Sequence, residues 1–343
     1  MKLEKILFAA VVAAALAVYA VDPGVSPGPG IRYATDAYPG FGFEDEDFKP
    51  EKKEPRLLGF WFGPKMEDAA SQFAWAAKLE SENSVSGARK AYDALVREWP
   101  TAPEAPKAQL KVAQLLSAEL DYEESFKEYR YLLDFYSNSC DFTAVAQEMY
   151  KLAELMREEG KTILFFRFRN TVDVRRAYES LVLRAPGAEF IPKAMLTIAS
   201  LREDEQRYSE AVAVYENLRN IYPTAEEAVE AAYCEARTRM SLVRDYGYNR
   251  NRVRDTADYL RQTITGVRLD GERVEELRTW LGECEGLLED EAWKAAKFYD
   301  SATRTRNSAV NAYGVFLKDY PTGAHADEAR TRIAELTGGE VEK

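Results

Sequence analysis

The sequence predicts an all-α fold, a right-handed superhelical solenoid of stacked helix pairs. The first observation behind this prediction is a phrase that recurs five times: a small or β-branched residue, Tyr four positions later, and a large apolar residue three further on. Its four-position and seven-position offsets keep one face of an α-helix apolar. The copies are Ala88/Tyr92/Leu95, Ser125/Tyr129/Leu132, Val174/Tyr178/Leu181, Ala211/Tyr215/Leu218 and Ala309/Tyr313/Phe316, with a weaker relative around Tyr259.

The end of each copy supplies the second observation. Position 11 holds Trp99, Tyr136, Ala185, Tyr222 or Tyr320, and Pro follows it in every copy except the second, which has Ser137. A proline just past the last turn stops a helix, because it lacks an N–H and its ring clashes with the preceding turn. The third observation is the spacing between copies, roughly 37 to 54 residues, which is typical of helical repeat arrays.

From residue 67 onward, helices of about 13 to 18 residues alternate with short turns. Acidic residues open several of the helices that follow a proline stop, which suits the positive end of the helix dipole. The expected pairs are 67–82 with 85–98, 103–118 with 122–136, 142–158 with 171–184, 188–203 with 208–221, 225–243 with 252–264, 271–287 with 289–302, and 306–319 with 323–337. One stretch, 158–170, is apolar, aromatic and basic together. It is either a longer loop or a buried helix extension.

Residues 1–20 have the composition of a secretory signal peptide. Two lysines precede an apolar run that ends in small residues. The alternative is an uncleaved membrane anchor, although the run is shorter than the roughly 20 residues that span a bilayer. We therefore expect an exported protein that localises to the periplasm.

Residues 21–66 form the second expected segment, an extended tether rich in Pro and Gly. Within it, 37–48 sets aromatic residues beside an acidic cluster and either docks on a partner or lies on the chain's own array. The apolar segment 57–64, which includes Trp61, either caps the first repeat or docks on a partner. Capping favours a monomer. The repeat array itself is expected over 67–338.

Composition excludes several classes of function. The net charge of −12 repels nucleic acid and anionic lipid headgroups. Cys140, Cys234 and Cys284 have no metal-ligand or disulfide-framework spacing, so they are small apolar core residues or include one stapling pair. His325, the only histidine, lies in an exposed-looking turn. No phosphate-binding loop, nucleophile elbow or zinc motif is present, so we expect no cofactor, no metal and no enzymatic activity.

The repeated unit resembles the tetratricopeptide repeat and, more narrowly, the BamD family of bacterial outer-membrane assembly lipoproteins. The resemblance is carried by 73–116, by 207–232, and by 289–336, where an Ala-x-Phe-Tyr helix, a helix ending in Tyr-Pro and an Ala-rich helix follow one another. It implies a scaffold at the outer membrane that binds the barrel-forming assembly subunit and unfolded outer-membrane proteins.

One departure from that family concerns the anchor. Its members carry a lipidated cysteine just after the signal, whereas the first cysteine here is Cys140. Membrane association would then depend on partners within a hetero-complex, on an uncleaved signal, or on segment 57–64.

The leading functional hypothesis is this assembly scaffold; the alternative is a periplasmic tetratricopeptide adaptor that coordinates cell-wall synthesis or envelope constriction. Stacked helix pairs offer an extended surface suited to protein segments. We expect client contacts on the first helices and subunit docking on the last ones. The candidate binding residues are Trp75, Lys78, Gln109 and Lys111 for the client, Trp293, Lys297 and Tyr299 for the subunit, and Trp61 in the apolar segment.

Overall fold

The structure, a computed structural model, describes residues 53, 63–159, 161–163, 166–168, 171–302 and 306–338. The chain divides into two compact units at Pro223–Thr224, and each is described by itself. The predicted signal peptide at 1–20, almost all of the predicted tether at 21–66, and Trp61 lie outside the described residues. The single array expected over 67–338 stays a prediction.

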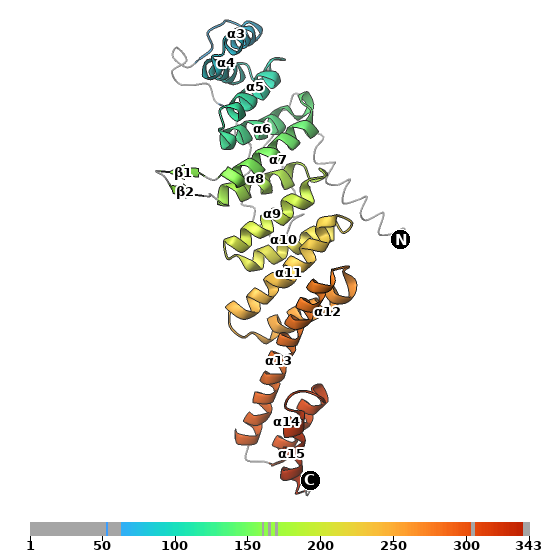
Figure 1. Ribbon diagram of the computed structural model, residues 1–343. Coiled ribbons are helices and arrows are strands. Elements are labelled where there is room, and N and C mark those ends of the chain that lie inside the picture. Colours follow the sequence, from blue (N-terminus) through green and yellow to red (C-terminus); the bar gives the residue numbers. More distant parts are fainter. Residues whose placement is uncertain are drawn as a thin grey trace. The chain divides into compact units, whose positions relative to one another are not determined.

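Unit 1 is a succession of helices in which each packs against the one before it and the one after it (Figure 1). This sequential packing is the solenoid construction that the sequence predicted, and the all-α class is confirmed. Its helices are α3 (Ala69–Ser81), α4 (Val85–Glu98), α5 (Ala105–Ala118), α6 (Tyr122–Tyr136), the short 3₁₀ turn η2 (Ser137–Ser139), α7 (Phe142–Glu159), α8 (Thr171–Arg184), α9 (Ile191–Asp204) and α10 (Tyr208–Ile221).

The first three positions of every phrase copy form the core of the helix pairs. None of these fifteen residues is more than 4% exposed, and Tyr92, Leu95, Tyr178 and Leu181 are fully buried. Each large apolar side chain buried in this way stabilises the fold by roughly 1.5 to 3 kcal/mol. The small first residue, Ala88 for example, leaves room for the neighbouring helix to approach. The predicted core positions are therefore confirmed.

In two copies of the phrase, the tyrosine at position 11 joins one repeat to an earlier one. The Tyr136 hydroxyl donates to the Pro100 carbonyl at 2.8 Å, and the Tyr222 hydroxyl donates to the Pro186 carbonyl at 2.6 Å, in both cases 36 positions upstream. In each case the acceptor is the carbonyl of the proline at the end of the preceding copy. These two tyrosines thus fix the spacing of neighbouring turns as well as lying at the end of a helix.

Helices that follow a proline stop begin one to three residues later than the sequence predicted. Two successive tight turns occupy the gap: the Ala188 N–H donates to Ala185, and the Ile191 N–H then donates to Ala188. The same pair of turns runs from Trp99 through Ala102 to Ala105. Glu104 and Glu189, which the sequence placed inside helices, belong to these turns.

The stretch expected as a loop or a helix extension is a β-hairpin. Strand β1 (Lys161–Ile163) pairs antiparallel with β2 (Phe166–Phe168), in the register Lys161↔Phe168 and Ile163↔Phe166. Both predicted alternatives were wrong. β-branched and aromatic residues fit a pleated ribbon better than a helix, which explains the outcome.

Unit 2 contains α11 (Glu226–Asp245), α12 (Arg250–Gly266), α13 (Gly271–Ala302), α14 (Arg306–Asp319) and α15 (Ala326–Thr337). The sequence predicted a break at residue 288, but α13 is one helix of 32 residues. Its buried positions continue at helical spacing across the expected break, from Leu277, Trp280 and Cys284 to Trp293 and Ala296. No proline interrupts this period, so the helix continues.

Candidate interaction surfaces

Three helices in each unit are locked by a tyrosine, a carboxylate and a cation. The Tyr92 hydroxyl on α4 donates to Glu80 on α3 at 3.0 Å, and Lys111 on α5 lies 2.8 Å from the other Glu80 oxygen. The hydrogen bond from Lys111 holds the pKa of Glu80 below its ordinary value against the effect of burial. Lys111, predicted as a client contact, is thus an internal partner of Glu80.

Unit 2 contains the same lock. The Tyr313 hydroxyl on α14 donates to Asp300 on α13 at 3.1 Å, and Arg332 on α15 contacts Asp300 at 2.8 Å. Arg332 is the main cause of the lowered pKa of Asp300. In both units the cation comes from the helix after the tyrosine, so one carboxylate connects three successive helices.

The other predicted client contacts of unit 1 differ in exposure. Trp75 is half-buried against the first core, and the Lys78 ammonium lies 6.0 Å from its ring centroid. The Lys78 side chain is 63% exposed, so these two residues form an accessible aromatic and cationic pair on α3. Gln109 is fully buried, and its Nε2 donates to the Glu128 carbonyl at 2.8 Å. Gln109 therefore offers no surface to a partner.

The predicted docking residues of unit 2 all lie on α13. Trp293 is 6% exposed and stacks on the His325 ring, with centroids 4.9 Å apart. Lys297 and Tyr299 are exposed, and Phe298 between them is 62% exposed. We call these last three residues the α13 strip.

Phe298 is the residue of the strip that the sequence prediction omitted. Trp293 and Ala296 face the core, and the same helical period then reaches Asp300. Positions 298 and 299 fall outside this face. That register was available from the sequence and would have marked Phe298 as exposed.

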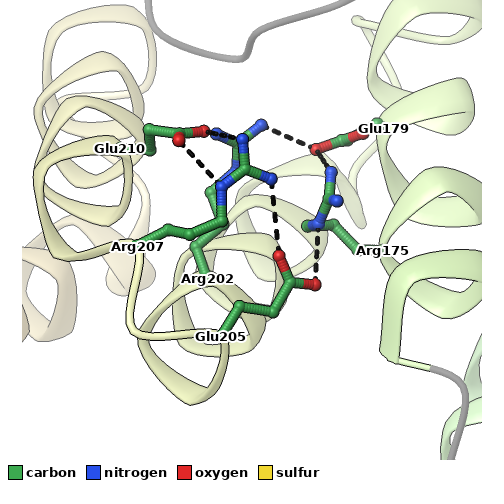
Figure 2. Close-up of polar contacts among 6 residues, drawn as sticks. All are labelled: Arg175, Glu179, Arg202, Glu205, Arg207 and Glu210. Carbon is green, nitrogen blue, oxygen red and sulfur yellow. Dashed lines mark hydrogen bonds and ion pairs between the residues drawn. The ribbon is translucent and has the colours of Figure 1, made fainter.

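Six charged residues form an ion-pair network in α8, α9, α10 and the turn after α9, as Figure 2 shows; they are Arg175, Glu179, Arg202, Glu205, Arg207 and Glu210. Arg202 is fully buried between Glu179, at 2.8 Å, and Glu210. Arg175 contacts Glu179 at 2.8 Å and Glu205 at 3.1 Å. The three positive and three negative charges balance, so this network holds helices together and leaves no charge to recruit a ligand.

A second buried cation lies between α4 and α6, and it comes from outside the helices. The Lys53 ammonium is 2.9 Å from Asp93 on α4 and 2.6 Å from Glu128 on α6. It also lies 5.3 Å from the centroid of the Tyr131 ring. The Lys53 side chain is only 10% exposed. We call Asp93, Glu128 and Tyr131 the ammonium site.

Electrostatics agree with this geometry. Burial raises the pKa of Asp93, but the Lys53 and Arg97 cations outweigh that effect and hold it below the ordinary value. Burial also raises the pKa of Tyr131, against a hydrogen bond from the Lys53 backbone. Sequence analysis missed this site, because nothing in the sequence pairs Lys53 with residues 40 and 75 positions downstream.

The cysteines are free thiols in the described part of the chain, and burial raises the pKa of Cys140 and of Cys284 to about 11. The same part of the chain contains no cluster of three or more His, Cys, Asp or Glu suited to a metal ion. Nor does any helix described here have the length and apolar character needed to cross a bilayer.

Comparison with known proteins points to one repeat family. Residues 193–225, which contain most of α9 and all of α10, match the tetratricopeptide repeat model. No curated protein sequence matches the chain.

Solved structures with similarity to the chain include a tetratricopeptide repeat protein from Parabacteroides merdae, with 13% identity over 79% of this chain and 99% of that one, and a TM-score of 0.28. PilF of Pseudomonas aeruginosa shows 10% identity over 77% and 96%, with a TM-score of 0.28. Apo RapI shows 12% identity over 79% and 87%, with a TM-score of 0.25.

The assignment depends on the repeat itself. Helices α9 and α10 carry the matched sequence, and the pairs before them repeat its buried Tyr phrase and its turns. The chain therefore contains tetratricopeptide-type repeats, and repeats of this type suggest a scaffold for protein interactions.

Proposed function

We propose that the protein is a periplasmic scaffold of the outer-membrane β-barrel assembly machinery, which binds the barrel-forming subunit and segments of unfolded client proteins. The tetratricopeptide-type fold supports a binding role without chemistry. The narrower assignment depends on the resemblance of 73–116, 207–232 and 289–336 to the BamD family and on the signal-like residues 1–20.

The observation that carries the proposal is the α13 strip. Phe298 is 62% and Tyr299 48% exposed, and Lys297 precedes them on the same helix. Two neighbouring exposed aromatic residues beside a cation are typical of protein interfaces, where aromatic anchors supply most of the binding energy. The strip lies within 289–336, which resembles the closing helices of that family. We assign it to subunit docking.

Client contact is assigned to α3. The exposed Lys78 and the half-buried Trp75 combine a cation with an aromatic surface near the start of the described array. Such a pair suits an extended apolar segment that carries acidic or aromatic side chains.

Affinity purification from detergent-solubilised envelopes tests the proposal. The bait is the tagged full chain, compared with its Phe298→Ser/Tyr299→Ser variant, and recovered proteins are identified by mass spectrometry. A matched control is Tyr246→Ser, because Tyr246 is an aromatic residue of unit 2 that is 55% exposed and lies on α11's C-terminal cap.

We expect the wild type and the control to recover the barrel subunit and the double variant to lose it. Recovery of cell-wall enzymes or constriction proteins in place of the subunit would overturn the proposal and favour the wall-synthesis adaptor. Equal recovery by the double variant would overturn the role of the α13 strip.

A further inference from the structure

The ammonium site has an equivalent in a later helix pair of unit 1, where an arginine of a neighbouring helix takes the place of Lys53. Asp93 and Glu179 each follow the buried Tyr of a phrase copy, 86 positions apart. Their register is fixed by equivalent ion pairs: Arg89 with Glu119 at 2.9 Å, and Arg175 with Glu205 at 3.1 Å. Asp93 and Glu179 are therefore structurally equivalent carboxylates.

The two carboxylates obtain their cations from different places. Each has an arginine on its own helix, Arg97 for Asp93 and Arg175 for Glu179. Glu179 receives its second cation from Arg202 on the next helix, but the residue equivalent to Arg202 beside Asp93 is Leu116. Asp93 takes its second cation from Lys53 instead, which lies before the first described helix.

We propose that Asp93, Glu128 and Tyr131 form a recognition site for one lysine of an extended protein segment, and that Lys53 occupies it as an internal ligand. A lysine on a partner protein would then bind here only by displacing Lys53. The inference goes beyond the proposed function, because it does not depend on which complex recruits the protein.

The geometry suits an ammonium group. One nitrogen lies 2.6 and 2.9 Å from carboxylates on two different helices, and the face of Tyr131 is within cation–π range. A compact ammonium with three donors can contact two carboxylates and the face of a ring at the same time. The hydrogen bond between the Lys53 backbone and Tyr131 shows that the site also contacts main chain, as an extended segment provides.

Amine labelling of the full chain tests whether Lys53 occupies the site. Brief acetylation followed by mass spectrometry measures the reactivity of Lys53 against that of Lys78, whose side chain is 63% exposed. We expect Lys53 to react at least about tenfold more slowly than Lys78, because a buried paired ammonium is protected. Glu128→Gln should raise the rate at Lys53. The matched control is Glu124→Gln on the same helix, which pairs with Lys127 at the surface and should leave the rate unchanged.

A binding experiment tests recognition in trans. The probe is a fluorescent peptide of residues 48–58 (FKPEKKEPRLL), titrated into wild-type protein and into Lys53→Met. A tethered ligand competes at an effective concentration in the millimolar range, so we expect at least about tenfold tighter binding to Lys53→Met. The same peptide with methionine at position 53 should not bind.

Three outcomes would overturn the proposal: equal labelling of Lys53 and Lys78, equal peptide affinity for wild type and Lys53→Met, or retained binding of the methionine peptide. Labelling of the Glu128→Gln variant measures whether Lys53 occupies the site, and this measurement does not use the Lys53→Met variant. If one of the two variants fails to fold, the other still tests the proposal.

Discussion

The hydroxyl of Tyr92 donates a hydrogen bond to Glu80 at 3.0 Å, from a side chain that is otherwise fully buried. Tyr178 reaches Glu154 at 2.5 Å and Tyr313 reaches Asp300 at 3.1 Å, so the relationship recurs in three phrase copies. The ring of the phrase tyrosine fills the core, and its hydroxyl meets a carboxylate at the edge of the core. This is a physical reason for Tyr where Phe would pack equally well.

Replacing Tyr92 by Phe should therefore destabilise unit 1 by about 1 kcal/mol, the net contribution of one intramolecular hydrogen bond. Urea unfolding of the full chain, followed by circular dichroism, measures the change. Tyr122→Phe is the control, because no hydrogen bond of the Tyr122 hydroxyl is recorded in the described part of the chain, and it should cost less than about 0.5 kcal/mol. Equal effects of the two substitutions would show that the Glu80 contact contributes nothing.

Arg202→Met should destabilise the protein by about 3 kcal/mol, because it removes one partner of a buried ion-pair network. Glu179 and Glu210 would then face each other across α9 with fewer cations. Arg207→Met in the same network is the control: its side chain is 41% exposed, and pairs in solvent contribute about 0 to 1 kcal/mol. Urea midpoints that shift equally for both variants would contradict the difference in burial.

Leu120→Asn should stabilise unit 1 by about 0.5 to 1 kcal/mol. Leu120 has φ of 63° in the turn between α5 and α6 and is 66% exposed, so it bears the cost of the left-handed region without gaining burial. Asn tolerates this region better than Leu. Leu120→Val is the opposite control, because a β-branched side chain worsens the strain. Thermal unfolding should rank Asn above Leu and Leu above Val.

Gly286→Ala should stabilise unit 2 by about 1 kcal/mol, the difference in helix propensity between the two residues. Gly286 lies in the interior of α13, and a Cβ there would meet no atom within 4 Å. Gly338→Ala is the matched control. Its φ of 79° at the end of α15 suits glycine, so the same substitution there should destabilise. Destabilisation by Gly286→Ala would instead indicate that α13 is not continuous at this point.

Stability should fall in acid through the carboxylates of unit 1. The pKa values of Asp93, Glu80 and Glu154 are lowered in the folded protein. A lowered folded pKa stabilises the fold above the unfolded pKa, about 4, and that contribution is lost as pH falls through the folded value. Urea midpoints should be constant from about pH 8 to pH 5 and decrease below about pH 4. Asp93→Asn should flatten part of this decrease, and an unchanged slope would show that Asp93 contributes none of it.

Short-range patterns predicted most of the fold. The phrase located fifteen buried positions, because a helical face depends only on local spacing. The same reasoning placed a false break at residue 288, where the apolar period in fact continues and α13 is one helix. It also missed the hairpin at Lys161–Phe168, since three-residue strands carry too little alternation to detect.

The candidate surfaces were predicted less well, for a physical reason. Trp293 faces the core and Phe298 the solvent, a difference that follows from the register of one continuous α13 and that the false break at residue 288 obscured. The contact of Lys53 with Asp93 and Glu128 joins residues far apart in the chain, so no local pattern could reveal it.

Helix α13 passes through both hydrophobic clusters of unit 2: Trp280 belongs to the one shared with α12, and Trp293 to the one shared with α14. At 1.5 Å per residue the two tryptophans are about 20 Å apart along a single rod. A load applied at Phe298 by a docked partner would therefore reach the cluster around Trp280 without a loop to absorb it. A force on one hydrophobic cluster of unit 2 is thus transmitted along α13 to the other cluster.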